Sequence, residues 1–211
     1  MIEPKHASPA KDVRDDIIDA AEERFRHYGY RKTNVGEIAG DVGMSAGNLY
    51  RYFENKEDIA AACALRCMSR LDDELSTILE TTEISASRRL EQYVLTNLRF
   101  NHDQAHNHPH ISEMVETVVG QRPDVIHRKI QVTKGILEEI IRQGMETGEF
   151  APLEPAATAD ALFTALVFFG TPTFMPLYPL DVMETKAIQV TRLLINGLIN
   201  IEINSAINPS E

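Results

Sequence analysis

Four histidines between residues 102 and 110 have side chains and a spacing that could support metal chemistry. They are His102, His106, His108 and His110, and Glu113 follows shortly after them. Imidazole and carboxylate groups bind zinc or nickel, and the first two histidines share a face if they lie on one helix. However, Asn107 and Pro109 flank His108, which is typical of a polar loop. We therefore expect no metal site here and keep metal sensing as an alternative.

The two cysteines of the chain, Cys63 and Cys67, are four residues apart and would face the same side of a helix. One such pair cannot build a disulfide scaffold, so the cysteine usage indicates a reducing, cytosolic compartment. We expect both thiols to serve as small apolar packing groups, and a redox or metal-binding pair is the alternative.

Several signature motifs of enzymes are absent from the sequence, which contains no H-E-x-x-H, P-loop or dinucleotide-binding fingerprint. We therefore expect a protein that is not an enzyme and that uses no cofactor. Two other classes stay open, namely a helical enzyme with a scattered site and a protein-interaction adaptor.

The composition is that of an ordinary globular protein, with 43% hydrophobic and 25% charged residues in a chain of 211. The 21 lysines and arginines are outnumbered by 32 aspartates and glutamates, which gives a net charge of −11. This balance excludes uniform coating of nucleic acid, so any nucleic-acid site must be a local basic surface. No apolar run approaches the roughly 18 residues of a membrane span, and we expect no membrane partner.

Apolar residues recur at helical spacing along most of the chain and predict an all-α fold. We expect helices over residues 11–28, 35–42, 45–53, 56–79, 85–100, 111–119, 123–147, 156–170 and 181–203. Residues 1–10 contain two prolines and predict a flexible arm, and the three prolines of residues 171–180 predict a loop. The expected arrangement is a three-helix unit over residues 11–55 followed by a larger helical unit over residues 56–211.

Residues 35–52 have the spacing of a helix-turn-helix. The apolar residues that would hold two short helices around a corner are Ile38, Val42, Met44, Leu49 and Tyr52. Gly43 falls in the turn, where a left-handed backbone conformation is easiest for glycine, and Ala39 is small where the helices cross. Asn34 and Glu37 have the spacing of a capping box at the start of the first helix. An ordinary helical hairpin is the alternative.

This stretch resembles the TetR family of transcriptional regulators. The matching segments are Phe25 to Tyr30, Thr33 to Val35, Glu37 to Ala39, Val42 to Ser45, Asn48 to Phe53 and Asn55 to Glu57. The resemblance implies a dimeric repressor with a helix-turn-helix DNA-binding domain over residues 11–55 and a ligand-binding and dimerisation domain over residues 56–211. It also implies a palindromic operator and release from that operator by a small molecule.

The resemblance further implies that the helix over residues 45–53 enters the major groove by its N-terminus. Candidates for contacting base edges are Ala46, Gly47, Asn48 and Arg51, among which Asn48 suits adenine and Arg51 suits guanine. Positions at which the family contacts phosphate are occupied by Thr33, Ser45, Tyr50, Tyr52 and Lys56, whose hydroxyl and ammonium groups suit that contact. Packing in the core of the corner is the alternative role for Tyr52.

The last two helices are expected to form the dimer interface that the resemblance implies. They are apolar over much of their circumference and carry small residues suited to close packing. The interface candidates are Ala161, Ala165, Leu166, Ile188, Thr191, Ile195 and Leu198. Burial of both helices inside one protomer is the alternative.

Aromatic, sulfur-containing and aliphatic side chains of the larger unit are candidates for an effector cavity, because such groups form adaptable apolar pockets. The candidates are Leu65, Met68, Phe100, Met114, Val118, Met145, Phe163, Phe168, Phe169, Phe174, Met175 and Tyr178. Ordinary core packing is the alternative for each of them. Few charged residues are available for burial here, so we expect a largely apolar effector. The helix that begins at Lys56 contains no glycine or proline and can act as a stiff lever toward the DNA-binding domain.

Overall fold

The computed structural model describes residues 12–81, 84–108 and 110–199. Over these residues the chain is helical, and the one extended contact is an antiparallel bridge between Phe150 and Ile199. The α-helices are α1 (Val13–Tyr28), α2 (Val35–Asp41), α3 (Ala46–Leu49), α4 (Lys56–Glu80), α5 (Ala86–Asn107), α6 (Ile111–Gln121), α7 (Pro123–Glu146), α8 (Pro155–Leu166) and α9 (Leu180–Leu198). Two short 3-10 helices, η1 (Val167–Gly170) and η2 (Pro172–Leu177), separate α8 from α9. The predicted all-α fold is confirmed. Within the described ranges no helix is long and apolar enough to cross a membrane.

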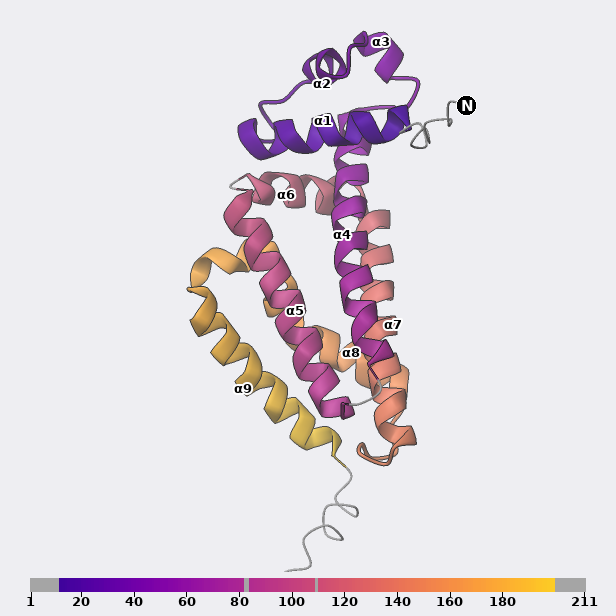
Figure 1. The fold of residues 1–211 in the computed structure, drawn as a ribbon, viewed down its shortest axis with the longest axis vertical. Helices are drawn as coiled ribbons and strands as arrows, with labels where there is room; N and C mark the ends of the chain where they lie inside the picture. Colours follow the sequence, from indigo (N-terminus) through magenta and orange to yellow (C-terminus); the bar gives the residue numbers. More distant parts are fainter. Residues whose placement is uncertain (1–11, 82–83, 109, 200–211) are drawn as a thin grey trace, which may run out of the picture.

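The molecule is elongated, and the helices α1, α2 and α3 form one end of it (Figure 1). The 25-residue α4 starts beneath them and runs down the larger unit beside α7. α6 lies crosswise below α1, at the junction of the two units, while α9 packs along α5 on one flank. α4 and α6 are therefore the helices through which the two ends of the molecule meet.

The buried apolar side chains form two clusters that share α4. The first cluster joins α1, α2 and α3 to the start of α4, and Ile38, Leu49 and Ile59 are fully buried in it. Val118 of α6 and Val125 of α7 belong to this cluster as well, so the larger unit completes the core of the smaller one. The second cluster is built from the lower half of α4 with α5, α7, α8 and α9. Because close-packed interiors transmit small displacements, the two units are mechanically connected.

The corner between α2 and α3 has the local structure that its residues predict. The capping box is confirmed, since Asn34 Oδ1 accepts from the Glu37 N–H at 3.0 Å and Glu37 Oε2 accepts from the Asn34 N–H at 2.9 Å. Gly43 lies in the turn with φ of +70°, a conformation that costs glycine little. The Met44 N–H donates to the Ala39 carbonyl at 2.9 Å and closes the corner, and Ala39 is fully buried.

Two predicted helices end earlier than expected. α3 is helical only over Ala46–Leu49, because the N–H groups of Arg51 and Tyr52 bond to carbonyls three residues back, which tightens the backbone into turns. The helix predicted over residues 156–170 ends at Leu166 and continues as the 3-10 helix η1. The predicted loop over residues 171–180 contains the 3-10 helix η2, whose first residue is a proline with a preset φ angle.

α5 is longer than predicted and ends at Asn107 rather than near residue 100. The last turns of α5 are polar, but polar residues do not by themselves end a helix. The helix ends shortly before Pro109, because a proline disfavours helical backbone in the residue that precedes it. The last helix ends at Leu198. The predicted arm over residues 1–10 and the predicted helical residues 200–203 lie outside the described residues.

Candidate DNA-binding surface and effector cavity

Ser45 is the N-cap of α3, and its hydroxyl Oγ accepts from the Asn48 N–H at 3.2 Å. Residues 43–47 also read G-x-S-x-G, the spacing that places a nucleophilic serine on a strand-to-helix turn in hydrolases. Here the preceding element is the helix α2, and the serine caps the next helix. The motif therefore belongs to the corner and supplies no hydrolase site.

The polar residues around α3 lie at the end of the molecule, where a DNA duplex could approach (Figure 1). Ser45, Gly47, Tyr50, Arg51 and Tyr52 are exposed, and Ala46 and Asn48 are half-buried. Tyr50 and Tyr52 are 51% and 40% exposed, so the ring of Tyr52 is only partly used for packing. These residues form one accessible surface with the side-chain chemistry that base edges and phosphates require.

Thr33 and Lys56 are occupied inside the domain, in contrast to the phosphate contacts expected of them. Thr33 is 2% exposed, and its hydroxyl donates to the Gly29 carbonyl at 2.9 Å. Lys56 Nζ donates to the carbonyls of Tyr30 and Thr33, both at 2.9 Å, and lies 4.1 Å from the centroid of the Tyr30 ring. Both side chains stabilise the turn between α1 and α2. A charged or hydroxyl side chain is thus as well suited to capping carbonyls as to binding phosphate, and sequence alone does not separate the two roles.

A cavity of about 300 Å³ lies in the larger unit, between α4, α5, α6, α7 and the end of α8. Five of the predicted cavity residues line it, namely Met68, Phe100, Met114, Val118 and Phe163. Leu166, which the sequence suggested for the dimer interface, lines it as well. Most of the lining is apolar, which suits a ligand that is itself largely apolar.

The other seven predicted cavity residues lie elsewhere, and this corrects their assignment. Leu65 packs against the core beneath the helix-turn-helix, while Met145, Phe168, Phe169 and Met175 belong to or pack against the second core. Phe174 and Tyr178 are 37% and 43% exposed on the surface. Helical periodicity indicates whether such a residue faces the interior of the protein. It does not indicate which of the inward-facing residues border a cavity.

The polar residues of the cavity were missed in the sequence. Tyr93, Asn97, Asn101 and Gln104 all line the cavity from α5. Their spacing of four, four and three residues places them on one face of the helix, and this pattern was the available signal. Asn101 is 6% exposed, and its Nδ2 donates to both the backbone carbonyl and the Oδ1 of Asn97 at 2.8 Å. Burial raises the pKa of Tyr93, so its phenol stays neutral.

α6 connects the cavity to the DNA-binding unit. Met114 and Val118 line the cavity from this helix, while Glu113 Oε2 accepts from the Arg31 N–H at 3.2 Å. A Cβ atom at Gly29, where φ is +86°, would lie 2.9 Å from the same Glu113 oxygen, so the turn after α1 sits directly against α6. Just beyond the other end of α6, Arg122 Nη1 donates to Asp58 Oδ1 of α4 at 2.7 Å. One short helix is thus flanked by a contact to the turn after α1 and by a contact to the first turn of α4, which follows the DNA-binding unit.

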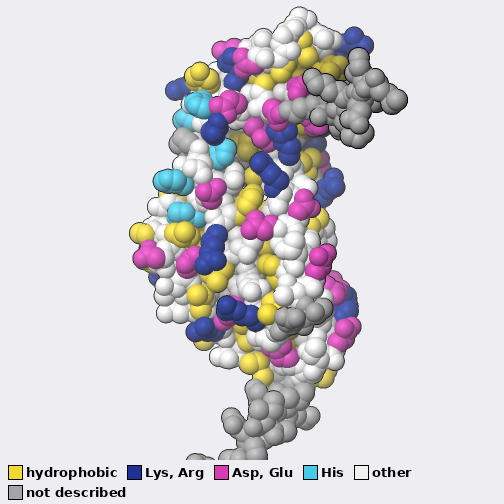
Figure 2. Space-filling view, viewed as in Figure 1, with side chains coloured by type: hydrophobic (Ala, Val, Ile, Leu, Met, Phe, Trp, Pro, Cys, Tyr) yellow, Lys and Arg dark blue, Asp and Glu magenta, His cyan; other side chains and the backbone are white. Residues whose placement is uncertain are grey.

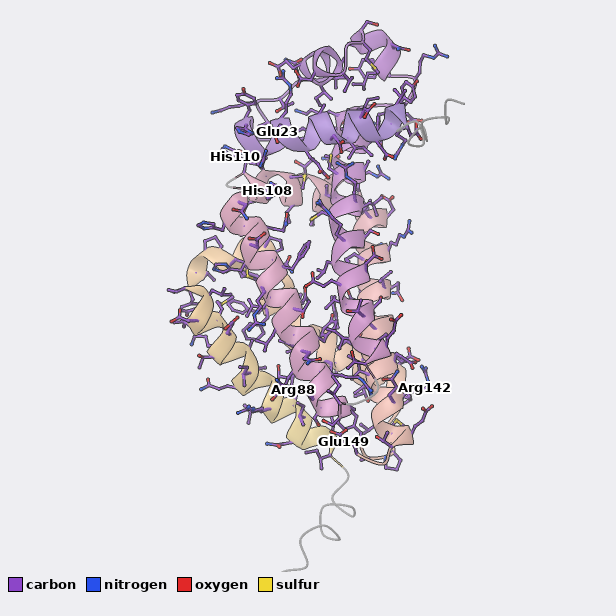
Figure 3. The ribbon with its side chains drawn as sticks, viewed as in Figure 1. Glu23, Arg88, His108, His110, Arg142 and Glu149 are labelled. Carbon is purple, nitrogen blue, oxygen red and sulfur yellow. The ribbon has the colours of Figure 1, made fainter. Side chains whose placement is uncertain are left out.

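The histidine tract lies at the same junction. His108 and His110 sit at the α5–α6 corner, close to the end of α1 that carries Glu23 (Figure 3), and histidines gather on this side of the surface in Figure 2. Among the described residues, no group of three or more His, Cys, Asp or Glu is arranged to hold a metal ion. Burial also raises the pKa of the Cys63 and Cys67 thiols, which makes them poor metal ligands and poor nucleophiles. The structure therefore gives no support to the metal- or redox-responsive alternative.

The dimer-interface candidates fall into two groups. Ala161 and Ala165 are exposed on α8, and Ile188 is half-buried on α9. Leu166, Thr191, Ile195 and Leu198 are at most 7% exposed within one protomer, because Leu166 borders the cavity and the other three lie on α9, which packs against α5. These four assignments are corrected. On the outer side of α9, Leu193 is 72% exposed and Val182 is 36% exposed, so two large apolar side chains face outward from this helix.

The molecule has a helix-turn-helix unit that is joined through α4 and α6 to a mostly apolar cavity. This arrangement is typical of transcriptional regulators that carry their DNA-binding and ligand-binding domains in one polypeptide. Residues 17–63 match the family described as bacterial regulatory proteins, tetR family, and residues 86–191 match the tetracyclin repressor-like C-terminal domain. The chain belongs to the TetR family of transcriptional regulators.

Several proteins are similar to this chain in sequence or in fold. The fatty acid metabolism regulator protein of Bacillus subtilis is 28% identical over 137 residues, which cover 63% of this chain and 68% of the relative. The helix-turn-helix-type transcriptional repressor KstR2 of Mycolicibacterium smegmatis is 24% identical over 155 residues, covering 71% of this chain and 73% of the relative. The crystal structure of the regulator FadR from Bacillus subtilis in complex with stearoyl-CoA has the same fold, with a TM-score of 0.64, 21% identity, and coverage of 87% of this chain and 98% of that chain.

Proposed function

We propose that this protein is a transcriptional repressor that binds a palindromic operator as a homodimer and is released by a largely apolar small molecule. The observation that carries the proposal is the double role of α6. Its residues Met114 and Val118 border the cavity, while Glu113 contacts the turn after α1. A ligand that moves α6 therefore moves the DNA-binding unit.

The second connection runs through α4. Met68 of this helix lines the cavity, and Asp58, near its start, is held by Arg122 from the end of α6. α4 contains no glycine or proline, so a displacement at Met68 is carried to its first turn without bending. In a dimer, the same displacement changes the separation of the two α3 helices. Because operator half-sites have a fixed spacing, simultaneous docking is then weakened.

The dimer surface that we propose is the outer side of α8 and α9. Ala161 and Ala165 permit close approach of helices, and Leu193 supplies a large exposed apolar side chain. Closed two-fold dimers that bury such a surface are the commonest soluble oligomers. The symmetry of a dimer also accounts for a palindromic operator, because each protomer reads one half-site.

A relative of similar fold supports the effector class. FadR of Bacillus subtilis was solved with stearoyl-CoA, a ligand with a long apolar chain. The cavity described here is likewise mostly apolar. We propose that it binds the apolar part of the effector, and that this binding is favoured in the conformation that does not fit the operator.

Selection of bound DNA from a random pool, using the full chain, tests the proposal. The expected result is a palindromic consensus sequence, bound by a dimer. Fluorescence anisotropy of that DNA is then measured with decanoyl-CoA and with uncharged aromatic compounds. We expect at least one of them to weaken operator binding about fivefold or more, in the range of ordinary allosteric coupling. The absence of any preferred sequence in the selected pool would contradict the proposal.

A further inference from the structure

One wall of the cavity carries a stripe of uncharged polar side chains. Asn97, Asn101 and Gln104 follow Tyr93 along a single face of α5, and all four border the cavity. Since an α-helix rises about 1.5 Å per residue, the stripe extends over roughly 16 Å and presents a polar group every 4 to 6 Å. The rest of the lining is mostly apolar, with Met114 and Val118 from α6 among its residues.

The cavity offers no free charge to a ligand. Among the described lining residues Lys129 is the only charged one, and its ammonium group already pairs with Asp72 of α4. Both partners are shielded, with side chains 20% and 22% exposed. A carboxylate or phosphate inside the cavity would have to break this pair or lose its hydration without compensation, and both are costly. A ligand group inside the cavity is therefore uncharged.

The amides of the stripe also argue against a plain hydrocarbon chain. Asn101 is buried, and its Nδ2 group already bonds to Asn97, whereas an amide has both donor and acceptor groups to satisfy. Gln104 Oε1 likewise accepts from the Cys67 thiol at 3.7 Å, so part of each amide is already paired. A ligand that covers Asn101 Oδ1 and Gln104 Nε2 without hydrogen-bonding to them leaves these remaining polar atoms desolvated and unpaired. Sites built around such groups discriminate against analogues that lack the matching polar atoms.

We infer that the effector is an elongated, uncharged molecule with hydroxyl or carbonyl groups along one edge, which bond to the stripe formed by Asn97, Asn101 and Gln104, and with an apolar face against α6. The inference rests on the proposed function of the cavity and specifies the ligand class. The volume of about 300 Å³ lies at the lower end of the roughly 300–1,000 Å³ range of small-ligand pockets, which suits a molecule of two or three rings. Phe100 and Phe163 in the lining favour flat aromatic rings.

Isothermal titration calorimetry on the full-length protein tests this inference with matched probes. A trihydroxystilbene carries hydroxyl groups along its length, 4-hydroxystilbene keeps one terminal hydroxyl, and decanoic acid is a chain with a charged end. We expect the trihydroxystilbene, which has two more hydroxyl groups, to bind about 25-fold more tightly than 4-hydroxystilbene, and decanoic acid to bind most weakly. Each additional hydrogen bond contributes on the order of fivefold in affinity.

Variants of the stripe complete the test. Gln104→Met, at a half-buried position, should weaken trihydroxystilbene binding about fivefold and leave 4-hydroxystilbene binding nearly unchanged. Asn101→Leu should act in the same way, and Asn107→Leu, at an exposed position on the same helix, is the matched control. If Asn101→Leu does not fold, Gln104→Met still decides the question.

Two results would overturn the inference. One is tighter binding of decanoic acid or 4-hydroxystilbene than of the trihydroxystilbene, and the other is unchanged trihydroxystilbene affinity in Gln104→Met. Either result leaves the proposed function intact if the protein still binds a palindromic operator and a chain-like compound releases it. Conversely, stripe-dependent binding of the trihydroxystilbene without any operator binding would support the ligand class and contradict the proposed repressor function.

Discussion

The backbone N–H of Arg31 donates to Glu113 Oε2 at 3.2 Å and so joins the turn after α1 to α6, across 82 residues of sequence. The same carboxylate group lies 3.6 Å from the imidazole of His110 and sits against Gly29, where a side chain would collide with it. Because the next turn of α6 borders the cavity, we propose that this carboxylate is the point at which a ligand-induced shift reaches the DNA-binding unit.

Glu113→Ala should uncouple effector binding from operator release. We expect the coupling between the two sites to fall about fivefold, with operator affinity in the absence of effector nearly unchanged, since residues between coupled sites carry about 0.5–2 kcal/mol. Fluorescence anisotropy measures the ratio of operator affinities without and with the cavity probe that binds most tightly, and this ratio is the coupling. Glu116→Ala is the control, because Glu116 makes only an exposed ion pair with Arg31. An unchanged ratio in Glu113→Ala would show that the coupling takes another route.

Arg51→Ala should cost about 1–3 kcal/mol of operator binding and relax sequence preference at one base pair in each half-site, as expected for loss of a base contact. Arg51 is exposed next to α3. Competition binding with the consensus operator and its single-base variants measures both effects. Arg142→Ala removes the same charge at the far end of the molecule (Figure 3), where it should not matter. If Arg51→Ala weakened binding to the consensus operator and to its single-base variants by the same factor, Arg51 would contact phosphate and not a base.

Lys56→Ala should destabilise the DNA-binding unit. Its ammonium group bonds to the carbonyls of Tyr30 and Thr33 and lies over the Tyr30 ring, and loss of a charged hydrogen-bond donor typically costs about 1.5–3 kcal/mol. Thermal unfolding followed by circular dichroism measures the change, with the exposed Lys32→Ala as control. An unchanged unfolding midpoint together with a smaller salt dependence of DNA binding would favour the phosphate contact expected from the sequence.

Leu193→Arg should yield folded monomers. Leu193 is 72% exposed on α9, so a charge there should disturb the proposed subunit contact but not the protomer. Leu198→Arg, by contrast, should unfold the protein, because Leu198 is 7% exposed in the second core and a buried unpaired charge is strongly destabilising. Light scattering and circular dichroism distinguish the two outcomes. A Leu193→Arg protein that remains a dimer would place the interface elsewhere.

Acidification should destabilise the protein through His108. Burial lowers the pKa of His108 below its ordinary value of about 6.5, and Arg26 and Arg70 lower it further against the opposing effect of Glu22 and Asp103. The unfolded chain then binds a proton at higher pH than the folded chain does. The stabilising contribution is therefore present above about pH 6.5 and is lost as the pH falls.

Urea unfolding between pH 7.5 and pH 5.5 measures this contribution. His108→Gln should flatten the decline in stability below about pH 6.5, whereas His127→Gln, at an exposed position on α7, should leave the decline unchanged. A decline of the same size in His108→Gln would assign the acid sensitivity to other groups.

Local features of the fold could be predicted from the sequence. The capping box of Asn34 and Glu37 and the turn at Gly43 depend on residues within one corner, and the structure has them as expected. The ends of helices were harder to predict where tertiary contacts or turn geometry compete with helical periodicity. The short α3 and the 3-10 helices between α8 and α9 are such cases.

Taken by itself, the sequence determined the helices, the helix-turn-helix corner and the family, because each depends on interactions between residues close together in the chain. Only the tertiary structure decided which inward-facing residues border the cavity and which merely fill the core, as the contrast between Met114 and Met175 illustrates. It also decided that Lys56 caps a turn and that Leu198 is buried while Leu193 is exposed. These outcomes depend on how helices that are distant in sequence pack against one another. The periodic pattern of apolar residues on one helix does not indicate which other helices pack against it.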